Sequence, residues 1–242
     1  MVIKAIFFDM GGTLERVWSA PDQRLQLMPE MNLYLKSLGI NLGLSEDELF
    51  GIVDSRYRKY HQWSVETMNE LSPTRVWQKY LLIGFPESEM ITDSIAENLM
   101  YFLEDRFYRR EFRPEVPEVL EAISKKGLKI GLISNICCHG LVPANLKKYG
   151  ISAYFDPVVL SSEFGRRKPD PTIFIYAAQL ARLQPADCIY VGDRIARDVL
   201  GAKQAGFSGA FQIINDYAHG EEDNGAEPDD IFYQMTELLD FI

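Results

Sequence analysis

Asp9 is the residue of this sequence whose type and position best suit nucleophilic chemistry. It ends a short apolar run at residues 3–8 and is followed by Gly11, Gly12 and Thr13. A carboxylate can attack a phosphoryl group to give an aspartyl phosphate, which divides one difficult displacement into two easier ones. We therefore predict that Asp9 attacks a phosphoryl group, and that Gly12 and Thr13 shape the loop around the phosphate.

Other polar residues follow later apolar runs in the same way. Ser134 and Asn135 come directly after one run, and Asp193 comes after another. Lys168 precedes the helical pattern that leads into the second of these runs. Because ligands of open parallel sheets bind at the carboxyl ends of the strands, we expect these side chains to gather beside Asp9.

The carboxylates at this edge suit a metal ion. Mg²⁺ prefers oxygen ligands and keeps several waters, so Asp9 and Asp193 are predicted to bind it. Asp198, one turn further along the chain, would lie behind them or bind the ion through water. Alternatively, Asp198 could serve only as a negative charge favoured near a helix N-terminus.

Lys168, Ser134 and Asn135 are the predicted phosphate-binding residues. Phosphoryl transfer depends on positive charge and on hydrogen-bond donors directed at the transferring oxygens. The Lys168 ammonium would balance the carboxylates and the phosphate, and Ser134 and Asn135 would donate to phosphate oxygens. Taken alone, Lys168 before a proline would be an exposed loop residue, but its place in this group favours the catalytic role.

Two different patterns of apolar residues follow the first run. From about residue 21 to 110 the periodicity is helical throughout, with no strand signal. Ser45 and Glu48 form a capping box before a helix at 49–63, and Ser72 precedes a helix that starts at a proline. A long helix is expected at about 88–108.

After residue 114 helices and strands alternate. Such alternation, with helices of about 10 to 15 residues, predicts right-handed βαβ units and a parallel sheet. We therefore expect an α/β fold, a doubly wound parallel sheet with an inserted helical cap domain, whose core comprises 1–15 and 111–242 and whose cap comprises 16–110. The expected helices are 119–125, 141–149, 172–181 and 196–205, and the expected strands are 128–133, 158–160, 188–191 and 209–213.

The composition narrows the class of protein. Of 242 residues 47% are apolar and 25% charged, as in globular proteins, and no apolar stretch reaches the roughly 18 to 20 residues that span a bilayer. The net charge of −10 argues against nucleic acid as a partner. The three cysteines favour a reducing compartment, so we expect a cytoplasmic protein with no membrane partner. The acidic tract at 221–223 is predicted to be a solvated loop.

Four segments, taken together, resemble the motifs of the haloacid dehalogenase-like (HAD) superfamily. They are Phe8-Asp9-Met10-Gly11-Gly12-Thr13-Leu14, Leu132-Ile133-Ser134-Asn135, residues 165–171 with Lys168, and residues 190–198 with Gly192, Asp193 and Asp198. The resemblance spans the chain, and the helical insert matches the position of the class-one cap. It implies a Rossmann-like core, Mg²⁺ as cofactor, the Gly11 carbonyl as a third metal ligand, and phosphatase activity on a small phosphorylated substrate.

Gly11 departs from the family pattern. The phosphatases carry a second aspartate there, which protonates the leaving oxygen and later activates water. Glycine cannot transfer a proton, and such catalysis is commonly worth about 10² to 10⁴-fold. The favoured interpretation remains a phosphatase in which water, a cap residue or a good leaving group replaces the acid.

Other interpretations stay open beside this one. One is a phospholigand-binding or regulatory protein without hydrolysis. Another is a C–P hydrolase, which lacks the same aspartate and would need a Schiff-base lysine such as Lys36, Lys59 or Lys79. A haloacid dehalogenase would lack both Mg²⁺ and the fourth motif.

Selectivity would come from the cap, whose residues Glu66, Asn69 and Glu70 are candidates to face the site. The cap aromatics fall at helical spacings and are expected in its core. His139 is expected to be a polar loop residue without a catalytic role.

Overall fold

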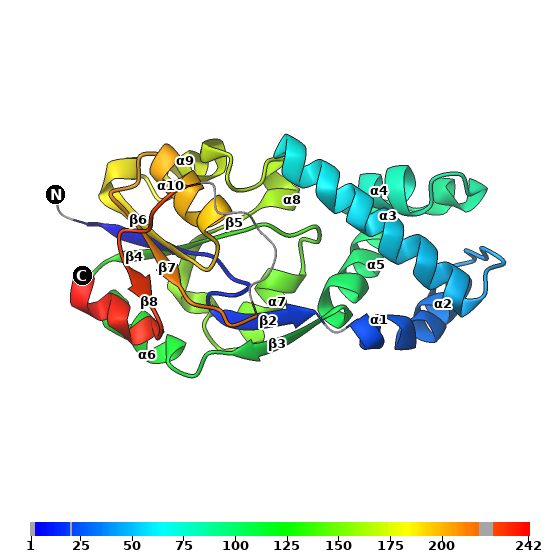
Figure 1. Ribbon diagram of the computed structural model, residues 1–242, viewed down its shortest axis with the longest axis horizontal. Helices are drawn as coiled ribbons and strands as arrows, with labels where there is room; N and C mark the ends of the chain where they lie inside the picture. The colour runs from blue at the N-terminus through cyan, green and yellow to red at the C-terminus, as the bar shows by residue number, and fades with distance from the viewer. Residues whose placement is uncertain (1–2, 20, 218–224) are drawn as a thin grey trace.

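A six-stranded parallel sheet lies at the centre of the computed structural model, which describes residues 3–19, 21–217 and 225–242 (Figure 1). Its strand order is β5-β4-β1-β6-β7-β8. The strands are β1 (Ala5–Phe8), β4 (Lys129–Ser134), β5 (Phe155–Leu160), β6 (Cys188–Gly192), β7 (Gly209–Ile213) and β8 (Ile231–Phe232). Every strand pair in this sheet is parallel, so the predicted α/β fold class is confirmed.

Both faces of the sheet are covered, which explains the continuous apolar character of β1. Successive side chains of a strand point to opposite faces. Ile6 and Phe8 accordingly join one buried cluster, and Ala5 and Phe7 join the other. The first cluster includes residues of α6 (Val116–Lys125), α7 (Leu141–Lys148) and the 3₁₀ turn η6 (Met235–Phe241). The second includes residues of α9 (Pro171–Leu180) and α10 (Leu200–Gln204).

The segment between β2 (Glu15–Ser19) and β3 (Tyr108–Phe112) is helical and gathers at one end of the molecule (Figure 1). The capping box at Ser45 and Glu48 is present, and Tyr60 and Trp77 are fully buried, as the sequence predicts. The elements are α1 (Pro21–Gln26), α2 (Met28–Ser37), α3 (Glu46–Thr67), α4 (Pro73–Val76), the π-helical turn η1 (Trp77–Leu81), the 3₁₀ turn η2 (Pro86–Met90) and α5 (Asp93–Arg106).

A two-stranded antiparallel ribbon joins this segment to the sheet and corrects the sequence analysis. β2 (Glu15–Ser19) pairs with β3 (Tyr108–Phe112), so the expected boundaries at 15/16 and 110/111 fall inside strands. The helix expected at 88–108 is also wrong at both ends, because a 3₁₀ turn precedes α5 and Thr92 caps it. In β3, half-buried and exposed side chains alternate, as in a strand with one covered face.

The remaining helices and strands of the α/β part lie close to their predicted positions. β7 matches its expected bounds, and α7 differs from its expected helix by one residue at the C-terminus. The helix expected at 196–205 is divided into a π-helical turn, η5 (Ile195–Val199), and α10. β8 and η6 are additional elements, and the acidic tract at 221–223 lies outside the described residues.

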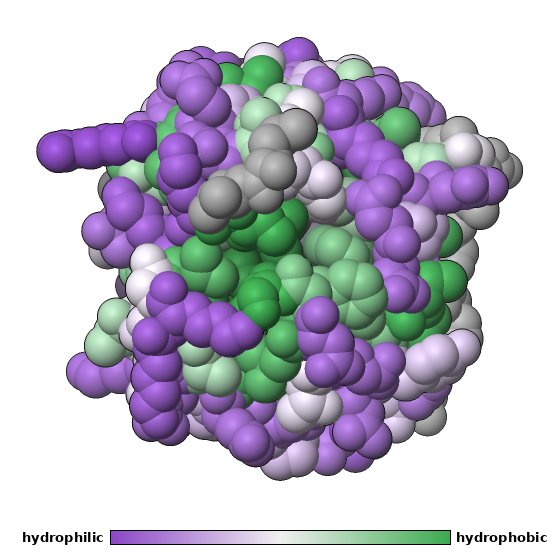
Figure 2. Space-filling model, turned by 90° about the vertical axis from the view of Figure 1, so that its left-hand side faces the viewer, coloured by the Kyte–Doolittle hydropathy of each residue, from purple (hydrophilic) through white to green (hydrophobic). Residues whose placement is uncertain are grey.

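The amino ends of the strands lie at the end of the molecule opposite the helical segment. Figure 2 shows on this face an apolar patch surrounded by hydrophilic residues. Ile231, Tyr233 and Phe241 of the C-terminal elements are exposed apolar residues. None of the helices described is both long and apolar enough to cross a membrane.

Helix α5 is anchored to the loop that follows β4. The Glu97 carboxylate accepts hydrogen bonds from the backbone N–H groups of His139 at 2.9 Å and Gly140 at 2.8 Å. These donors lie at the N-terminus of α7, where N–H groups have no partner within the helix and negative charge is favoured. Glu97 thus links the helical segment to the sheet domain, and His139 contributes its backbone to that link.

We expect Glu97→Ala to lower the free energy of unfolding by about 1 to 3 kcal/mol, because two backbone donors lose a charged acceptor. Urea denaturation followed by circular dichroism measures the change. Glu118→Ala in α6, which removes an exposed carboxylate, should change stability by less than about 0.5 kcal/mol. Equal effects of the two substitutions would contradict the anchoring role.

Candidate active site

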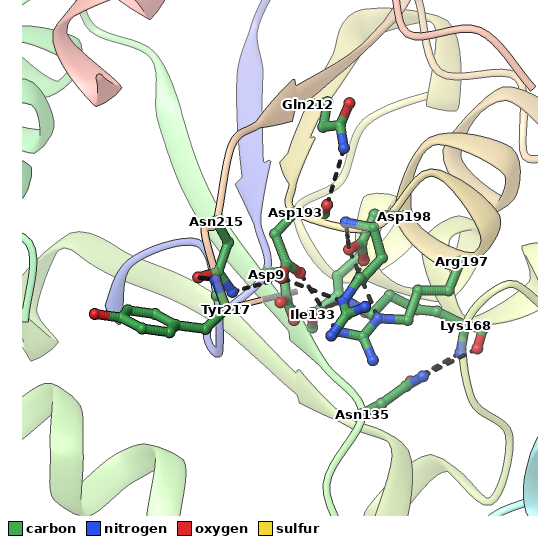
Figure 3. Close-up of polar contacts among 12 residues, drawn as sticks. Asp9, Ile133, Asn135, Lys168, Asp193, Arg197, Asp198, Gln212, Asn215 and Tyr217 are labelled. Atoms are coloured by element: carbon green, nitrogen blue, oxygen red, sulfur yellow. Dashed lines mark hydrogen bonds and ion pairs between the residues drawn. The ribbon is translucent and has the colours of Figure 1, made fainter. Parts of the chain in front are cut away.

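Three aspartates meet at the carboxyl end of the central strands. Asp9 follows β1, Asp193 follows β6, and Asp198 lies on η5. Each offers a carboxylate oxygen within 4.8 Å of the others, and all three residues are buried. Strand order brings them together, because β1 and β6 are neighbours in register from Ala5 and Cys188 onward. The predicted clustering of these residues at one sheet edge is therefore present (Figure 3).

Lys168 holds two of these carboxylates. Its ammonium lies 2.7 Å from Asp9 Oδ1 and 2.6 Å from Asp198 Oδ1, and its side chain is 0% exposed. It also donates to the Ile133 carbonyl at 2.9 Å and contacts the Tyr190 hydroxyl at 2.7 Å. A buried ammonium requires such a complete set of acceptors, since its desolvation is costly.

The three carboxylates have different electrostatic environments. Burial raises the pKa of Asp9 to about 6, although the Lys168 charge opposes this change. Burial likewise raises the pKa of Asp193, with Arg197 opposing it. For Asp198, burial is outweighed by the charges of Lys168 and Arg197, and the pKa is lowered. Asp198 is thus the most firmly ionised of the three.

Two glycines allow the carboxylates to approach the backbone. A Cβ on Gly12, whose φ is +95°, would lie 2.1 Å from Asp193 Oδ2. A Cβ on Gly192 would lie 2.4 Å from the Asp198 side chain. Any larger residue at either position would displace an aspartate, so the glycine spacing of both motifs is required by this packing.

The remaining predicted residues occupy different depths. Ser134 and Asn135 line the cavity beside Asp9. The Asn135 amide donates to the Lys168 carbonyl and accepts from the Lys168 N–H, so its side chain holds the lysine backbone. Thr13 is fully buried behind the site.

Several residues that the sequence analysis did not select complete the site. Asn215 donates to Asp193 Oδ2 at 3.0 Å, and it follows β7, so the strand-end rule could have identified it. Tyr190 lies inside the apolar strand β6, where no pattern distinguishes its hydroxyl. Arg197 lies 3.4 Å from Asp193 Oδ1, and its place between two aspartates of the fourth motif was an available signal.

Glu15 is a further buried carboxylate at the base of the ribbon. It accepts hydrogen bonds from Arg110 at 2.8 Å, Tyr149 at 2.6 Å and Asn145 at 3.4 Å. Burial raises its pKa, with Arg110 opposing the change. Glu15 lines the same cavity as Asp9.

The cavity above Asp9 has a volume of about 630 Å³ and is lined by both the sheet domain and the helical segment. Of the cap-loop candidates, Glu70 lines it, whereas Asn69 accepts a hydrogen bond from Arg166 and Glu66 is exposed. No lysine of the described residues lines the cavity, and the cap lysines Lys36, Lys59 and Lys79 are exposed.

The donor set fits a hard divalent cation. Asp9 Oδ2 is buried and has no hydrogen-bond partner, so one carboxylate oxygen is left for a ligand. Mg²⁺ is bound by one or two carboxylates with waters or substrate oxygens completing the shell. Asp9 and Asp193 could hold such an ion, with Asp198 behind them.

Replacement of Lys168 should show how strongly the clustered carboxylates destabilise the folded protein when their cation is missing. We expect Lys168→Gln to lower the free energy of unfolding of the metal-free protein by about 3 to 5 kcal/mol at pH 7.5, because the buried carboxylates lose their shared cation. The pKa of Asp9 is raised from 3.8 to about 6 on folding, so protonation of Asp9 favours the folded state. That contribution is fully present below about pH 4 and lost as pH rises through about 6.

The deficit of Lys168→Gln should therefore shrink on going from pH 7.5 to pH 5, because a protonated Asp9 needs no cation. Denaturation curves at both pH values measure this change. Lys147→Gln, which removes an exposed lysine, is the control for charge alone. A deficit that grows at pH 5 would show that Lys168 does not serve as the counter-ion.

Known proteins share this architecture. The glyceraldehyde 3-phosphate phosphatase of Methanopyrus kandleri is 28% identical over 247 residues, which cover 100% of this chain and 97% of that protein. A phosphoglycolate phosphatase of Vibrio vulnificus is 32% identical, covering 99% of this chain and 96% of that protein. The crystal structure of a HAD phosphatase from Thermococcus onnurineus matches with a TM-score of 0.61 at 22% identity, over 99% of this chain and 97% of that chain.

A 2-haloacid dehalogenase from Pseudomonas syringae matches with a TM-score of 0.64 at 22% identity, over 99% of this chain and 97% of that chain. The structural likeness therefore concerns the fold, which phosphatases and dehalogenases share. The family model for haloacid dehalogenase-like hydrolases matches residues 3–206, which confirms the resemblance predicted from the four motifs. The chain belongs to the haloacid dehalogenase-like hydrolases.

Proposed function

We propose that this hydrolase is a Mg²⁺-dependent phosphatase that removes phosphate from a small phosphorylated metabolite through an aspartyl phosphate on Asp9. The observation that carries the proposal is the buried cluster of Asp9, Asp193 and Asp198, with Asp9 Oδ2 left without a partner. The curated relatives are named phosphatases, and the chain spans nearly their whole length.

In this proposal each residue of the site has a separate task. Asp9 attacks phosphorus, and Lys168 holds Asp9 in place while its charge favours the added negative charge of the phosphoryl group. Asp9, Asp193 and the Gly11 carbonyl would hold Mg²⁺, which supplies positive charge to the phosphoryl oxygens. Ser134, at the end of β4, faces the cavity and can donate a hydrogen bond to the same group.

We propose that the helical segment at residues 16–110 acts as a cap over Asp9 and selects the substrate. Support comes from the cavity, which the segment shares with the sheet domain through Tyr57, Glu70 and Glu104. The relatives are named for phosphoglycolate and glyceraldehyde 3-phosphate, both small phosphate esters. A cavity of about 630 Å³ leaves room for a leaving group of similar or greater size.

The alternatives receive less support. A C–P hydrolase requires a lysine at the substrate, and no described lysine lines the cavity. A metal-free dehalogenase does not require the fourth-motif carboxylates that are buried here beside Asp9. A binding protein without hydrolysis remains the outcome to test against, since Gly11 provides no acid.

The first test is phosphate release from a panel of phosphorylated metabolites with Mg²⁺. We expect Asp9→Asn to abolish release, because an amide cannot attack phosphorus, and Asp193→Ala to weaken Mg²⁺ binding in calorimetry. Asp47→Asn, an exposed site in α3, should change neither measurement. If the wild type binds Mg²⁺ but releases no phosphate even from an aryl phosphate, the protein is a phospholigand-binding protein.

The second test concerns Gly11. Its φ lies outside the left-handed range, and an added Cβ would meet only Val17, at 3.5 Å. Gly11→Asp should therefore fit and restore an acid near the leaving oxygen. We expect turnover of alkyl phosphates to rise, by at most about 10² to 10⁴-fold, and turnover of aryl phosphates to change much less, because aryl leaving groups need little protonation.

Gly11→Ala is the matched control, since it adds the Cβ without the carboxyl group. Wild-type protein should prefer aryl over alkyl phosphates, and only the aspartate variant should reduce this preference. An equal gain for both substrate classes, or the same gain in the alanine variant, would rule out acid catalysis as the missing function.

A further inference from the structure

Arg197 lies among the three aspartates of the site. It belongs to the π-helical turn η5, which follows β6. Its Nη2 is 3.4 Å from Asp193 Oδ1, and its Nε is 3.7 Å from Asp198 Oδ2 (Figure 3). The guanidinium therefore spans the two carboxylates that flank it in the fourth motif.

The position of Arg197 differs from those of the other cations. Lys168 is fully buried and does not line the cavity, whereas Arg197 lines it and its side chain is 21% exposed. Arg194 lines the cavity as well and lies 3.4 Å from Asp193 Oδ2, but the Arg197 guanidinium also lies near Asp198, at 3.7 Å. Burial is the largest influence on the pKa of each aspartate, and the Arg197 charge lowers the pKa of all three.

This position places Arg197 in competition with a metal ion. Asp193 Oδ1 is the carboxylate oxygen nearest to the Arg197 Nη2, while Asp193 Oδ2 accepts from Asn215. A divalent cation on Asp193 and a guanidinium on the same carboxylate repel each other in a buried site. A turn of the Arg197 side chain from Asp193 toward the cavity, which is its open side, would relieve this repulsion.

The cavity is also where a phosphoryl group attached to Asp9 would lie. A guanidinium presents several N–H donors in one plane and binds phosphate oxygens through two parallel hydrogen bonds. Asp9, Ser134 and Arg197 all line this space. An Arg197 side chain that turns away from the metal ion would therefore turn toward the phosphoryl group.

We propose that Arg197 is a further phosphate-binding residue, which pairs with Asp193 in the metal-free protein and turns to the phosphoryl oxygens when Asp193 binds Mg²⁺. This inference rests on the proposed function. It assigns Arg197 two roles with opposite consequences, since the side chain opposes metal binding and assists phosphate binding. A residue that merely supported the fold would assist both.

The test measures binding rather than turnover. Calorimetry gives the affinity for Mg²⁺ alone, and then the affinity for inorganic phosphate at saturating Mg²⁺. We expect Arg197→Gln to tighten Mg²⁺ binding by about tenfold, through loss of a competing charge, and to weaken phosphate binding by roughly 10 to 100-fold. Arg197→Lys, which keeps the charge without the planar donors, should fall between the wild type and the glutamine variant in both measurements.

Arg75→Gln, which removes an exposed arginine of α4 outside the cavity, is the control for the loss of one positive charge. It should change phosphate affinity by less than about threefold. Loss of both affinities in Arg197→Gln, with an unchanged melting temperature, would overturn the proposal in favour of a supporting role. Tighter Mg²⁺ binding with unchanged phosphate affinity would overturn the phosphate contact.

The wild-type measurements separate this inference from the proposed function. If wild type binds Mg²⁺ in a manner that Asp193→Ala abolishes and the Arg197 variants bind like wild type, the metal site stands and the role of Arg197 fails. If wild type binds no Mg²⁺, the proposed function fails first, and the Arg197 proposal is overturned with it. Should Arg197→Gln not fold, Arg197→Lys still tests the weakened phosphate affinity.

Discussion

The ion pairs between Lys168 and the two carboxylates of Asp9 and Asp198 are the interaction on which the rest of the site depends. Three carboxylates within 4.8 Å of one another in a buried space repel, and burial raises the pKa of each. The ammonium, at 2.7 and 2.6 Å from Asp9 and Asp198, keeps Asp198 ionised and limits the rise in the pKa of Asp9. Its own position is fixed by residues of the two strands that flank β1, Asn135 after β4 and Tyr190 in β6. The parallel order β4-β1-β6 thus brings Asn135, Asp9 and Tyr190 around one lysine.

Buried carboxylates with hydrogen-bonded partners also connect the site to the ribbon and to the helical segment. Glu15 begins β2 only a few residues after Asp9, and its carboxylate joins Arg110 of β3 to Tyr149 at the end of α7. Glu104 of α5 accepts from the Cys137 backbone N–H at 3.2 Å, in the loop whose first residues face the cavity. Breaking such a buried pair is costly, because it leaves a charge without a partner. The attachments of the helical segment are therefore specific in position, and they converge on the residues next to Asp9.

The sequence predicts the site residues at the strand ends better than it predicts the ribbon. The polar residues at strand ends were predictable because each depends on a local pattern, an apolar run followed by a carboxylate or hydroxyl, and parallel strands place such ends together. The ribbon was not, because Glu15 pairs with Phe112, a partner nearly the whole helical segment away, and the charged stretch at Arg109-Arg110-Glu111 has no apolar alternation. The contact of Tyr190 with Lys168 was not predictable for a different reason. Its ring packs with Phe174 as any strand aromatic would, and only its hydroxyl, at the far end, reaches Lys168.

The loop after β4 joins the helical segment to the residues around Lys168. Ser134, the last residue of β4, lines the cavity, while Cys137 and His139 in the loop donate their backbone N–H groups to Glu104 and Glu97 of α5. These two glutamates are seven residues apart and so lie on one face of the helix. The same loop begins with Asn135, whose side chain holds the Lys168 backbone through two hydrogen bonds. One short piece of chain therefore connects α5 both to Ser134 and to the lysine that balances the carboxylates.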